Sequence, residues 1–267
     1  MVFGYFVPIC QVKNRLLAGY NPFMRRRFFV DHFEGSSAAL DGHASGHLSR
    51  VLRAEPGQLY ELSDGREVWL GRIERVGQRK RGDARIEFSL VERIPAREPA
   101  LAIQLLISIV KFDRFEWCLE KAVELDAAKI IPLAAARSDK PLLAAAGKRG
   151  ERWSRILLES AQQSRRLRPP HLSELQKPLA AFRESSAACK ILLSERPAAP
   201  SLRSVLALAR GATSAALAIG PEGGWTDEEI HAATAAGFAE ASLGENILRT
   251  ETAVLAALSV LRFALAD

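Results

Sequence analysis

Two turns that contain glycine, each placed directly after an apolar run, constrain the fold of this chain more than any other feature. The turn Ile219–Gly224 follows the apolar run 215–219. The segment Leu243–Ala253 has a glycine as its second residue and leads into a helical pattern. Thr226, with Glu229 three residues later, forms a capping box that begins the helix after the first turn. Because α/β sheets bind ligands at the carboxyl ends of their strands, these turns predict a pocket built mostly from main chain.

Strand-like and helical segments alternate in the second part of the chain. Apolar runs of the buried parallel type and helical patterns follow one another in the order 101–110, 113–125, 129–133, 151–166, 190–193 and 201–210, before the two glycine turns. This alternation predicts an α/β fold with an open, mostly parallel sheet over residues 100–267.

The first part of the chain has a different pattern. Short alternating runs at 58–62, 68–73 and 85–90 predict strands, and Ser63–Arg66 predicts a turn between two of them. These strands favour a small β-barrel domain over residues 24–95, and Pro95–Pro99 is typical of a linker.

Charge and cysteine content limit the possible partners. The formal net charge of +6 fits a polyanionic partner, although a charge of this size also serves solubility alone. Cys10, Cys118 and Cys189 are far apart, which indicates a reducing, cytoplasmic compartment and neither a disulfide framework nor a metal site. The chain contains no apolar run long enough for a transmembrane helix, so we expect no membrane partner.

The two glycine-turn motifs, Ile219–Gly224 and Leu243–Ala253, resemble those of the RsmE family within the SPOUT class of RNA methyltransferases. The resemblance covers residues 25–267. It implies an enzyme that uses S-adenosylmethionine to methylate N3 of a uridine in small-subunit (16S) ribosomal RNA. It also implies a trefoil-knotted SPOUT domain, an N-terminal PUA-like, RNA-binding barrel and a homodimer. Two alternatives stay open: a SPOUT enzyme with another RNA target, and a non-catalytic RNA-binding factor in ribosome assembly.

Members of the family typically begin near the element Arg27–Val30. We therefore expect Met24 to be the native start and residues 1–23 to be an extension from a misassigned translation start. The basic residues Lys13 and Arg15 follow the apolar stretch of this extension, which is not the order of a secretory signal.

The cofactor site that the resemblance implies is formed by three loops. The chain contains neither a P-loop motif nor the dinucleotide-binding glycine pattern, which argues against nucleotide binding of those kinds. Asn246 stands where the family often carries a basic residue, which weakens the case for a phosphate contact there. The residues expected around S-adenosylmethionine are Leu193, Ser194, Glu195, Ile219, Gly220, Pro221, Glu222, Gly223, Gly224, Leu243, Gly244, Asn246, Ile247, Leu248, Thr250 and Ala253.

Arg249 and Glu251 are the candidate catalytic residues. Uridine N3 must lose its proton before it attacks, and a guanidinium near the ring oxygens favours the resulting anion. A surface salt bridge or a phosphate contact is the alternative for Arg249. Glu251 lies in a first helical turn, where an acid also offsets the helix dipole. The general base stays open between Glu251, Glu222 and water.

A basic surface is expected on two parts of the chain. The helical pattern 151–166 places a polar stripe opposite Trp153 and Leu157, although such a face is often merely solvated. In the barrel, the turn 79–81 and several arginines are candidates for phosphate contacts, and His47 has a half-buried structural role as its alternative. The candidate RNA-binding residues are Arg25, Arg26, Arg27, His47, Arg50, Arg53, Gln163 and Arg166.

The last helical pattern, from Thr250 to about Ala266, is apolar nearly all round. Val254, Leu258 and Leu261 lie on one stripe, and further apolar residues lie on other faces. A helix of this kind is buried on more than one side, which predicts a homodimer. The alternative is a core helix of a monomer.

Overall fold

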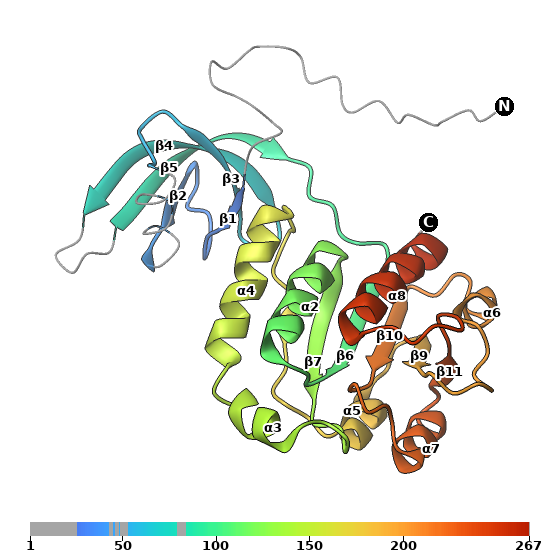
Figure 1. The fold of residues 1–267 in the computed structure, drawn as a ribbon. Coiled ribbons are helices and arrows are strands. Elements are labelled where there is room, and N and C mark those ends of the chain that lie inside the picture. The colour runs from blue at the N-terminus through green and yellow to red at the C-terminus, as the bar shows by residue number, and fades with distance from the viewer. Residues whose placement is uncertain (1–25, 43–44, 46–47, 49–52, 79–83, 267) are drawn as a thin grey trace.

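The computed structural model describes residues 26–42, 45, 48, 53–78 and 84–266 (Figure 1). The expected extension 1–23, Met24 and the basic turn 79–81 lie outside these residues. The described strands form two sheets, one on each side of the segment 95–101. Among the described residues, no helix combines the length and the hydropathy needed to cross a membrane.

The N-terminal sheet has five strands in the order β1-β3-β4-β5-β2. Its pairs are antiparallel except for β1 with β3. Phe28, Leu62 and Phe88 fill its core. Its strands are β1 (Arg27–Phe29), β2 (Ser37–Leu40), β3 (Leu59–Ser63), β4 (Val68–Gln78) and β5 (Ala84–Ile94).

The C-terminal sheet has six strands, all parallel, in the order β11-β9-β10-β6-β7-β8. Its strands are β6 (Ala102–Ser108), β7 (Ala127–Leu133), β8 (His171–Leu172), β9 (Cys189–Leu193), β10 (Ser214–Ile219) and β11 (Ala239–Ala241). The helices are α2 (Phe112–Glu124), α3 (Lys140–Ala146), α4 (Gly150–Gln163), α5 (Pro178–Glu184), α6 (Leu202–Leu208), α7 (Asp227–Ala235) and α8 (Thr250–Leu265).

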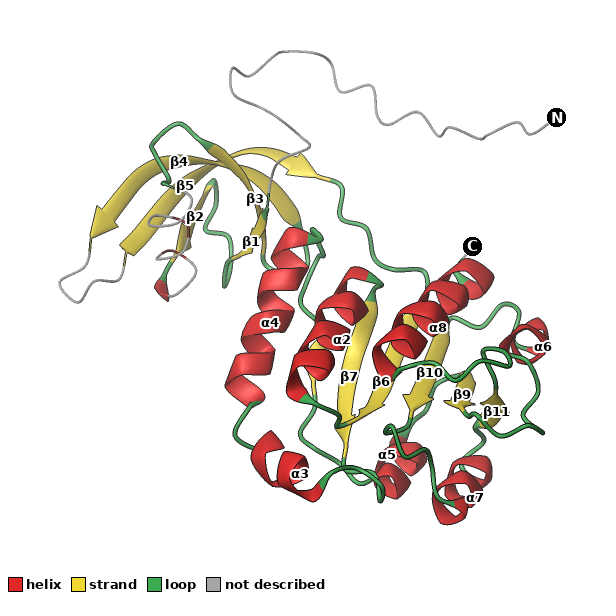
Figure 2. Ribbon diagram, in the orientation of Figure 1, coloured by secondary structure: helices red, strands yellow, loops and turns green. Residues whose placement is uncertain are grey.

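Helices cover both faces of the C-terminal sheet (Figure 2). Helices α2, α4, α6 and α8 pack on one face, against side chains such as Leu105 and Ile107. Helices α5 and α7 pack on the other face, against Leu106 and its neighbours. Because side chains alternate along a strand, buried residues on both faces explain the continuous apolar runs in the sequence. The predicted α/β fold with a parallel sheet is confirmed.

The two sheets meet at the segment that follows α4. The Ser63 hydroxyl donates to the Leu167 carbonyl at 2.6 Å, and the Arg168 guanidinium donates to the Gly65 carbonyl at 3.0 Å. Helix α4 also contacts β1. Phe29 of β1 packs against the core of the C-terminal sheet. The N-terminal sheet is therefore in direct contact with the C-terminal unit.

Helix α4 ends three residues earlier than the sequence pattern predicts. Arg165 adopts a left-handed conformation with a φ of 55°, and the Arg166 amide donates to the Ala161 carbonyl at 3.0 Å. This is the hydrogen bond of a Schellman motif, which closes a helix. The prediction that Arg166 lies on the exposed helical stripe is therefore wrong.

Gly71 gives a test of the core of the N-terminal sheet. A Cβ atom at Gly71 would lie 2.5 Å from the Leu62 Cδ1 atom and 3.3 Å from the Phe88 Cβ atom, and both neighbours are buried. We expect Gly71→Ala to lower the free energy of unfolding by about 1–3 kcal/mol through overpacking. Urea denaturation measures this loss. Gly77→Ala is the control, because its nearest neighbour would lie at 3.6 Å. Equal stability of the two variants would contradict the prediction.

Candidate functional site

Three chain segments leave the carboxyl ends of the adjacent strands β11, β9 and β10. The segments 194–201, 220–226 and 242–249 begin where β9, β10 and β11 end. The first and third are joined directly, because the Leu202 amide donates to the Ser242 carbonyl and the Ser242 amide donates to the Pro200 carbonyl, both at 2.8 Å. The three segments that carry the expected cofactor residues therefore lie at one edge of the sheet.

Trp225 connects two of these segments. Its indole Nε1 donates to the carbonyl of Leu193, the last residue of β9, at 2.9 Å. A Cβ atom at Gly220 would lie 3.0 Å from the Trp225 ring, so the indole leaves no room for a side chain there. Gly224 has a φ of 71°, a left-handed conformation that glycine adopts without strain. The turn therefore presents main chain, as a site for a flat ligand requires.

The segment after β7 supports the same turn from a second side. The Arg137 guanidinium donates to the Gly223 carbonyl at 3.0 Å and to the Trp225 carbonyl at 3.1 Å. Glu229 completes the predicted capping box with Thr226, and its other carboxylate oxygen accepts from the Ala136 amide at 2.9 Å. The 134–139 segment and the 220–226 turn are thus joined by both side-chain and main-chain groups.

Arg114, near the start of α2, lies between two acidic candidates of the site. Its guanidinium is hydrogen-bonded to the Glu222 carboxylate and lies 3.8 Å from the Glu251 carboxylate. The Glu251 Oε2 atom is buried and has no hydrogen-bond partner among the described residues. Burial, followed by the charge of Glu251, raises the pKa of the Cys118 thiol to about 12, so this cysteine stays protonated at neutral pH.

The expected cofactor residues differ in exposure. The strand-end residues Leu193 and Ile219 are buried, as is Thr250 at the start of α8. Ser194, Gly220, Gly224, Leu243, Leu248 and Ala253 are half-buried, and Pro221 is buried. Exposed to solvent are Glu195, Glu222, Gly223, Gly244, Asn246, Ile247 and the catalytic candidate Arg249. The strand-end residues of the site are thus buried, whereas most of its loop residues are exposed or half-buried.

Two of the expected RNA-binding arginines are engaged inside the protein. Arg27 is buried and forms an ion pair with Glu61 at 2.9 Å. Arg166 is also buried and donates to the Ala127 carbonyl at 2.5 Å; burial lowers the pKa of its guanidinium. Both guanidinium groups are thus hydrogen-bonded to acceptors inside the protein, and their assignment to RNA binding stays a prediction.

The remaining RNA-binding candidates divide into two groups. Arg53 and Gln163 are exposed, and Arg26 is half-buried. Arg25, His47 and Arg50 lie outside the described residues. The predicted stripe on α4 is exposed, but its Arg152 forms a bidentate pair with Glu116 of α2, with both oxygens at 2.7 Å. That pair lowers the pKa of the Glu116 carboxyl, chiefly through the hydrogen bond from Arg152.

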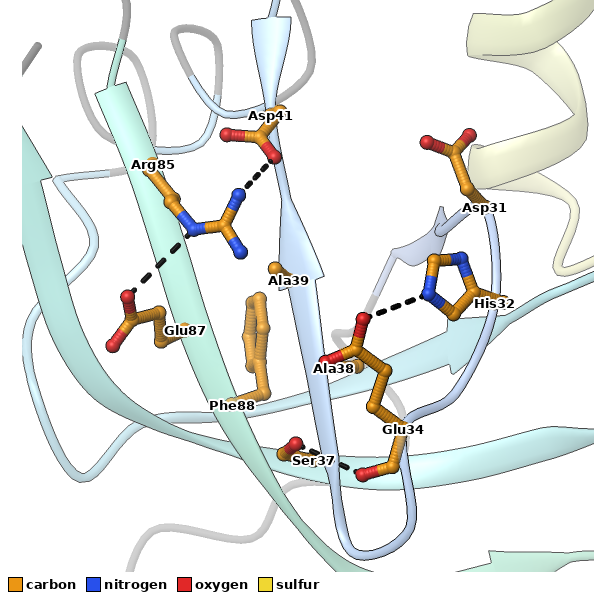
Figure 3. A pocket seen from close by; sticks show the side chains of 10 residues that line it. All are labelled: Asp31, His32, Glu34, Ser37, Ala38, Ala39, Asp41, Arg85, Glu87 and Phe88. Carbon is orange, nitrogen blue, oxygen red and sulfur yellow. Dashed lines mark hydrogen bonds and ion pairs between the residues drawn. The ribbon is translucent and has the colours of Figure 1, made fainter.

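A cavity of about 410 Å³ lies on the N-terminal sheet, and all of its lining residues come from the segments 31–41 and 85–88 (Figure 3). Arg85 forms ion pairs with Asp41 and Glu87 across it, and His32 pairs with Glu34. Its charged side chains are mainly acidic, which does not suit a phosphate. Among the residues that the structure describes, no cluster of histidine, cysteine and acidic side chains has the composition to hold a metal ion.

Sequence reasoning did not identify the contacts that support the glycine turn. Trp225 directly follows Gly224, so its large side chain beside a glycine turn was an available signal. The partners of Arg114 and Arg137 are 108 and 86 residues away in the sequence. No local pattern indicates such pairings.

Comparison with known proteins identifies the family. A model of the RNA methyltransferase domain matches residues 97–262. The ribosomal RNA small subunit methyltransferase E of Synechocystis sp. is 34% identical, over 80% of this chain and 68% of its own length. That of Mycobacterium bovis is 32% identical, over 86% of this chain and 88% of its own length.

Solved structures agree with this result. The structure of ribosomal RNA small subunit methyltransferase E from Neisseria gonorrhoeae, bound to S-adenosyl methionine, has a TM-score of 0.78 and 28% identity, and covers 91% of this chain and 98% of its own. A Legionella pneumophila protein in complex with the same cofactor also has a TM-score of 0.78, with 31% identity, and covers 91% of this chain and 99% of its own. The present chain belongs to the ribosomal RNA small subunit methyltransferase E family.

Proposed function

We propose that this protein is an S-adenosylmethionine-dependent methyltransferase that modifies N3 of a uridine in small-subunit ribosomal RNA. The observation that carries the proposal is the meeting of three segments at the ends of β9, β10 and β11, inside the region that matches the RNA methyltransferase domain. A relative with this fold is bound to S-adenosyl methionine. A ribosomal RNA target would imply that the protein acts in the cytoplasm.

The composition of the site fits this cofactor. The turn at Gly220–Gly224 presents main chain above the Trp225 indole, and Leu243 and Leu248 supply apolar surface suited to an adenine ring. The buried, unpartnered oxygen of Glu251 is an acceptor that a polar or cationic ligand group satisfies. When bound, S-adenosylmethionine supplies a methyl group on a positively charged sulfur.

The residues of the chain position the uridine and stabilise its charge. Arg249 is exposed immediately before α8, where its guanidinium is available to the uracil oxygens. Placed positive charge favours the N3 anion that attacks the methyl group. Proton removal falls to Glu251, Glu222 or water. Since the reaction is an in-line displacement, correct placement of the two reactants contributes most of the rate.

The domain organisation follows from the same proposal. Residues 24–95 form a PUA-like barrel that binds RNA, and Arg53 is its exposed basic candidate among the described residues. Residues 100–267 form the catalytic SPOUT domain with a trefoil knot. The pairing of Ser242 with the chain at Pro200–Leu202, just before α8, supports the knot, because the C-terminal segment lies against the loop it would pass through.

A homodimer completes the proposal. One side of α8 is buried through Val254, Leu258 and Leu261, while Leu255, Val260 and Phe263 are exposed, Phe263 by 85%. Exposed apolar side chains gathered on one helix face are typical of a subunit interface.

Nucleoside mapping tests the proposed reaction. We expect small-subunit ribosomal RNA from a strain that lacks the gene to lose 3-methyluridine at one position, and re-expression of the full chain to restore it. Mass spectrometry of ribosomal RNA fragments measures this change. Loss of a different modification would assign another RNA target, and an unchanged RNA would favour a non-catalytic binding factor.

Arg249→Met tests the catalytic assignment. Removal of a group that stabilises developing charge lowers kcat by about 100-fold or more, whereas the cofactor Kd changes little. Transfer of a labelled methyl group to small-subunit RNA gives kcat, and calorimetry gives the Kd. Arg249→Lys should recover part of the activity, because it retains the charge. A normal kcat in Arg249→Met would exclude Arg249 from the chemistry.

Phe263→Asp tests the proposed dimer. A carboxylate at the centre of an apolar interface is desolvated without a partner, so we expect the variant to be monomeric. Light scattering coupled to size-exclusion chromatography measures the mass in solution. Val91→Asp, at an exposed apolar position of the N-terminal sheet, is the matched control and should leave the mass unchanged. A monomeric parent protein would refute the dimer directly.

A further inference from the structure

The turn Pro221–Trp225 has little internal support of its own. Its internal hydrogen bond runs from the Gly224 amide to the Pro221 carbonyl at 2.8 Å. The turn includes two consecutive glycines, Gly223 and Gly224, and glycine loses more conformational freedom on ordering than any other residue. A ligand that binds the main chain of such a turn requires other parts of the fold to hold the turn in one conformation.

Two arginines from different segments contact this turn. Arg137, after β7, donates from one nitrogen to the Gly223 and Trp225 carbonyls, so it fixes the direction of two peptide groups. Arg114, on α2, is hydrogen-bonded to the carboxylate of Glu222. Arg137 thus holds the main chain of the turn, and Arg114 holds the Glu222 side chain. We propose that Arg114 and Arg137 are a pair of positioning residues that hold this turn in the conformation that binds S-adenosylmethionine; this inference rests on the proposed function.

The pair also joins the turn to the rest of the site. The Arg114 guanidinium lies 3.8 Å from Glu251 at the start of α8. The Trp225 indole, whose backbone carbonyl accepts from Arg137, donates to Leu193 at the end of β9. Arg114 therefore joins the turn to the start of α8, and Trp225 joins the turn to the end of β9.

Close packing between Arg137 and the turn supports a role for Arg137 in fixing the conformation of the turn. A Cβ atom at Gly223 would lie 3.1 Å from the Arg137 Cβ atom, so the base of the Arg137 side chain and the turn are in close contact. Arg137 is exposed, and the Arg114 side chain is 27% exposed. In water a single contact of this kind contributes modestly to stability, so the effect should appear in ligand binding more than in unfolding.

Calorimetry on the full chain tests the pair. The variants are Arg114→Met, Arg137→Met and the double substitution, with S-adenosylmethionine and S-adenosylhomocysteine as the two probes. We expect each single variant to raise both Kd values about tenfold, and the double variant to raise them further. Arg203→Met, an exposed arginine on α6, removes the same charge and should leave both Kd values within about twofold of the parent.

The two probes distinguish an effect on the conformation of the turn from an effect of the lost arginine charge alone. S-adenosylmethionine carries one more positive charge than S-adenosylhomocysteine, so loss of an arginine charge alone would tighten the first relative to the second. That result would overturn the proposal. A lower melting temperature with unchanged Kd values would also overturn it, because it would show a purely structural role.

Conservative variants keep the test decisive if a methionine variant does not fold. Arg137→Lys retains the charge but lacks the planar guanidinium, and Arg114→Lys is its counterpart; we expect a smaller rise in both Kd values, about threefold. Unchanged binding in folded variants would refute the pair. A parent protein that binds neither probe would instead refute the proposed function, so the two failures are distinguishable.

Discussion

The adjacency of three parallel strands is the constraint on which the site depends. Strand β9 lies between β11 and β10, so the chain that leaves each of them emerges at the same edge of the sheet. The chain beyond the carboxyl ends of parallel strands is where α/β sheets bind their ligands. If β9 did not lie between β11 and β10, Leu193, the 220–224 turn and the 242–249 segment would not be brought together in this way.

The parts of the fold with strong local patterns could be predicted from the sequence. The apolar strands and the capping box at Thr226 are local features, and periodicity or spacing reveals them. The sequence analysis does not predict the strands β8 and β11, because elements of two and three residues hold too little pattern, and it does not predict helix α5. The site was predictable as a set of loops, but the contacts of Arg114 and Arg137 were not, since tertiary packing alone creates them.

Counts of basic residues overstate the surface available to RNA. Arg27 and Arg166 are buried with acceptors inside the fold, and Arg152 pairs with Glu116. A buried guanidinium that has already exchanged water for protein acceptors gains nothing from a phosphate it cannot reach. The net charge of +6 includes these internally paired arginines, so it overstates the number of cationic side chains that an RNA could contact.

The segment after α4 joins the two sheets, and this junction bears on function. The helix closes at the left-handed Arg165, whose side chain lies 3.7 Å from Glu61 of the N-terminal sheet, and Leu167 then accepts from Ser63. These contacts fix the N-terminal sheet against the unit that holds the three-loop site. If the first sheet binds RNA, its position relative to the cofactor is set by this junction and not by the linker 95–99 alone. Substrate choice would then depend on the geometry between the two sheets, because the target nucleotide must reach the site while its flanking RNA stays on the N-terminal sheet.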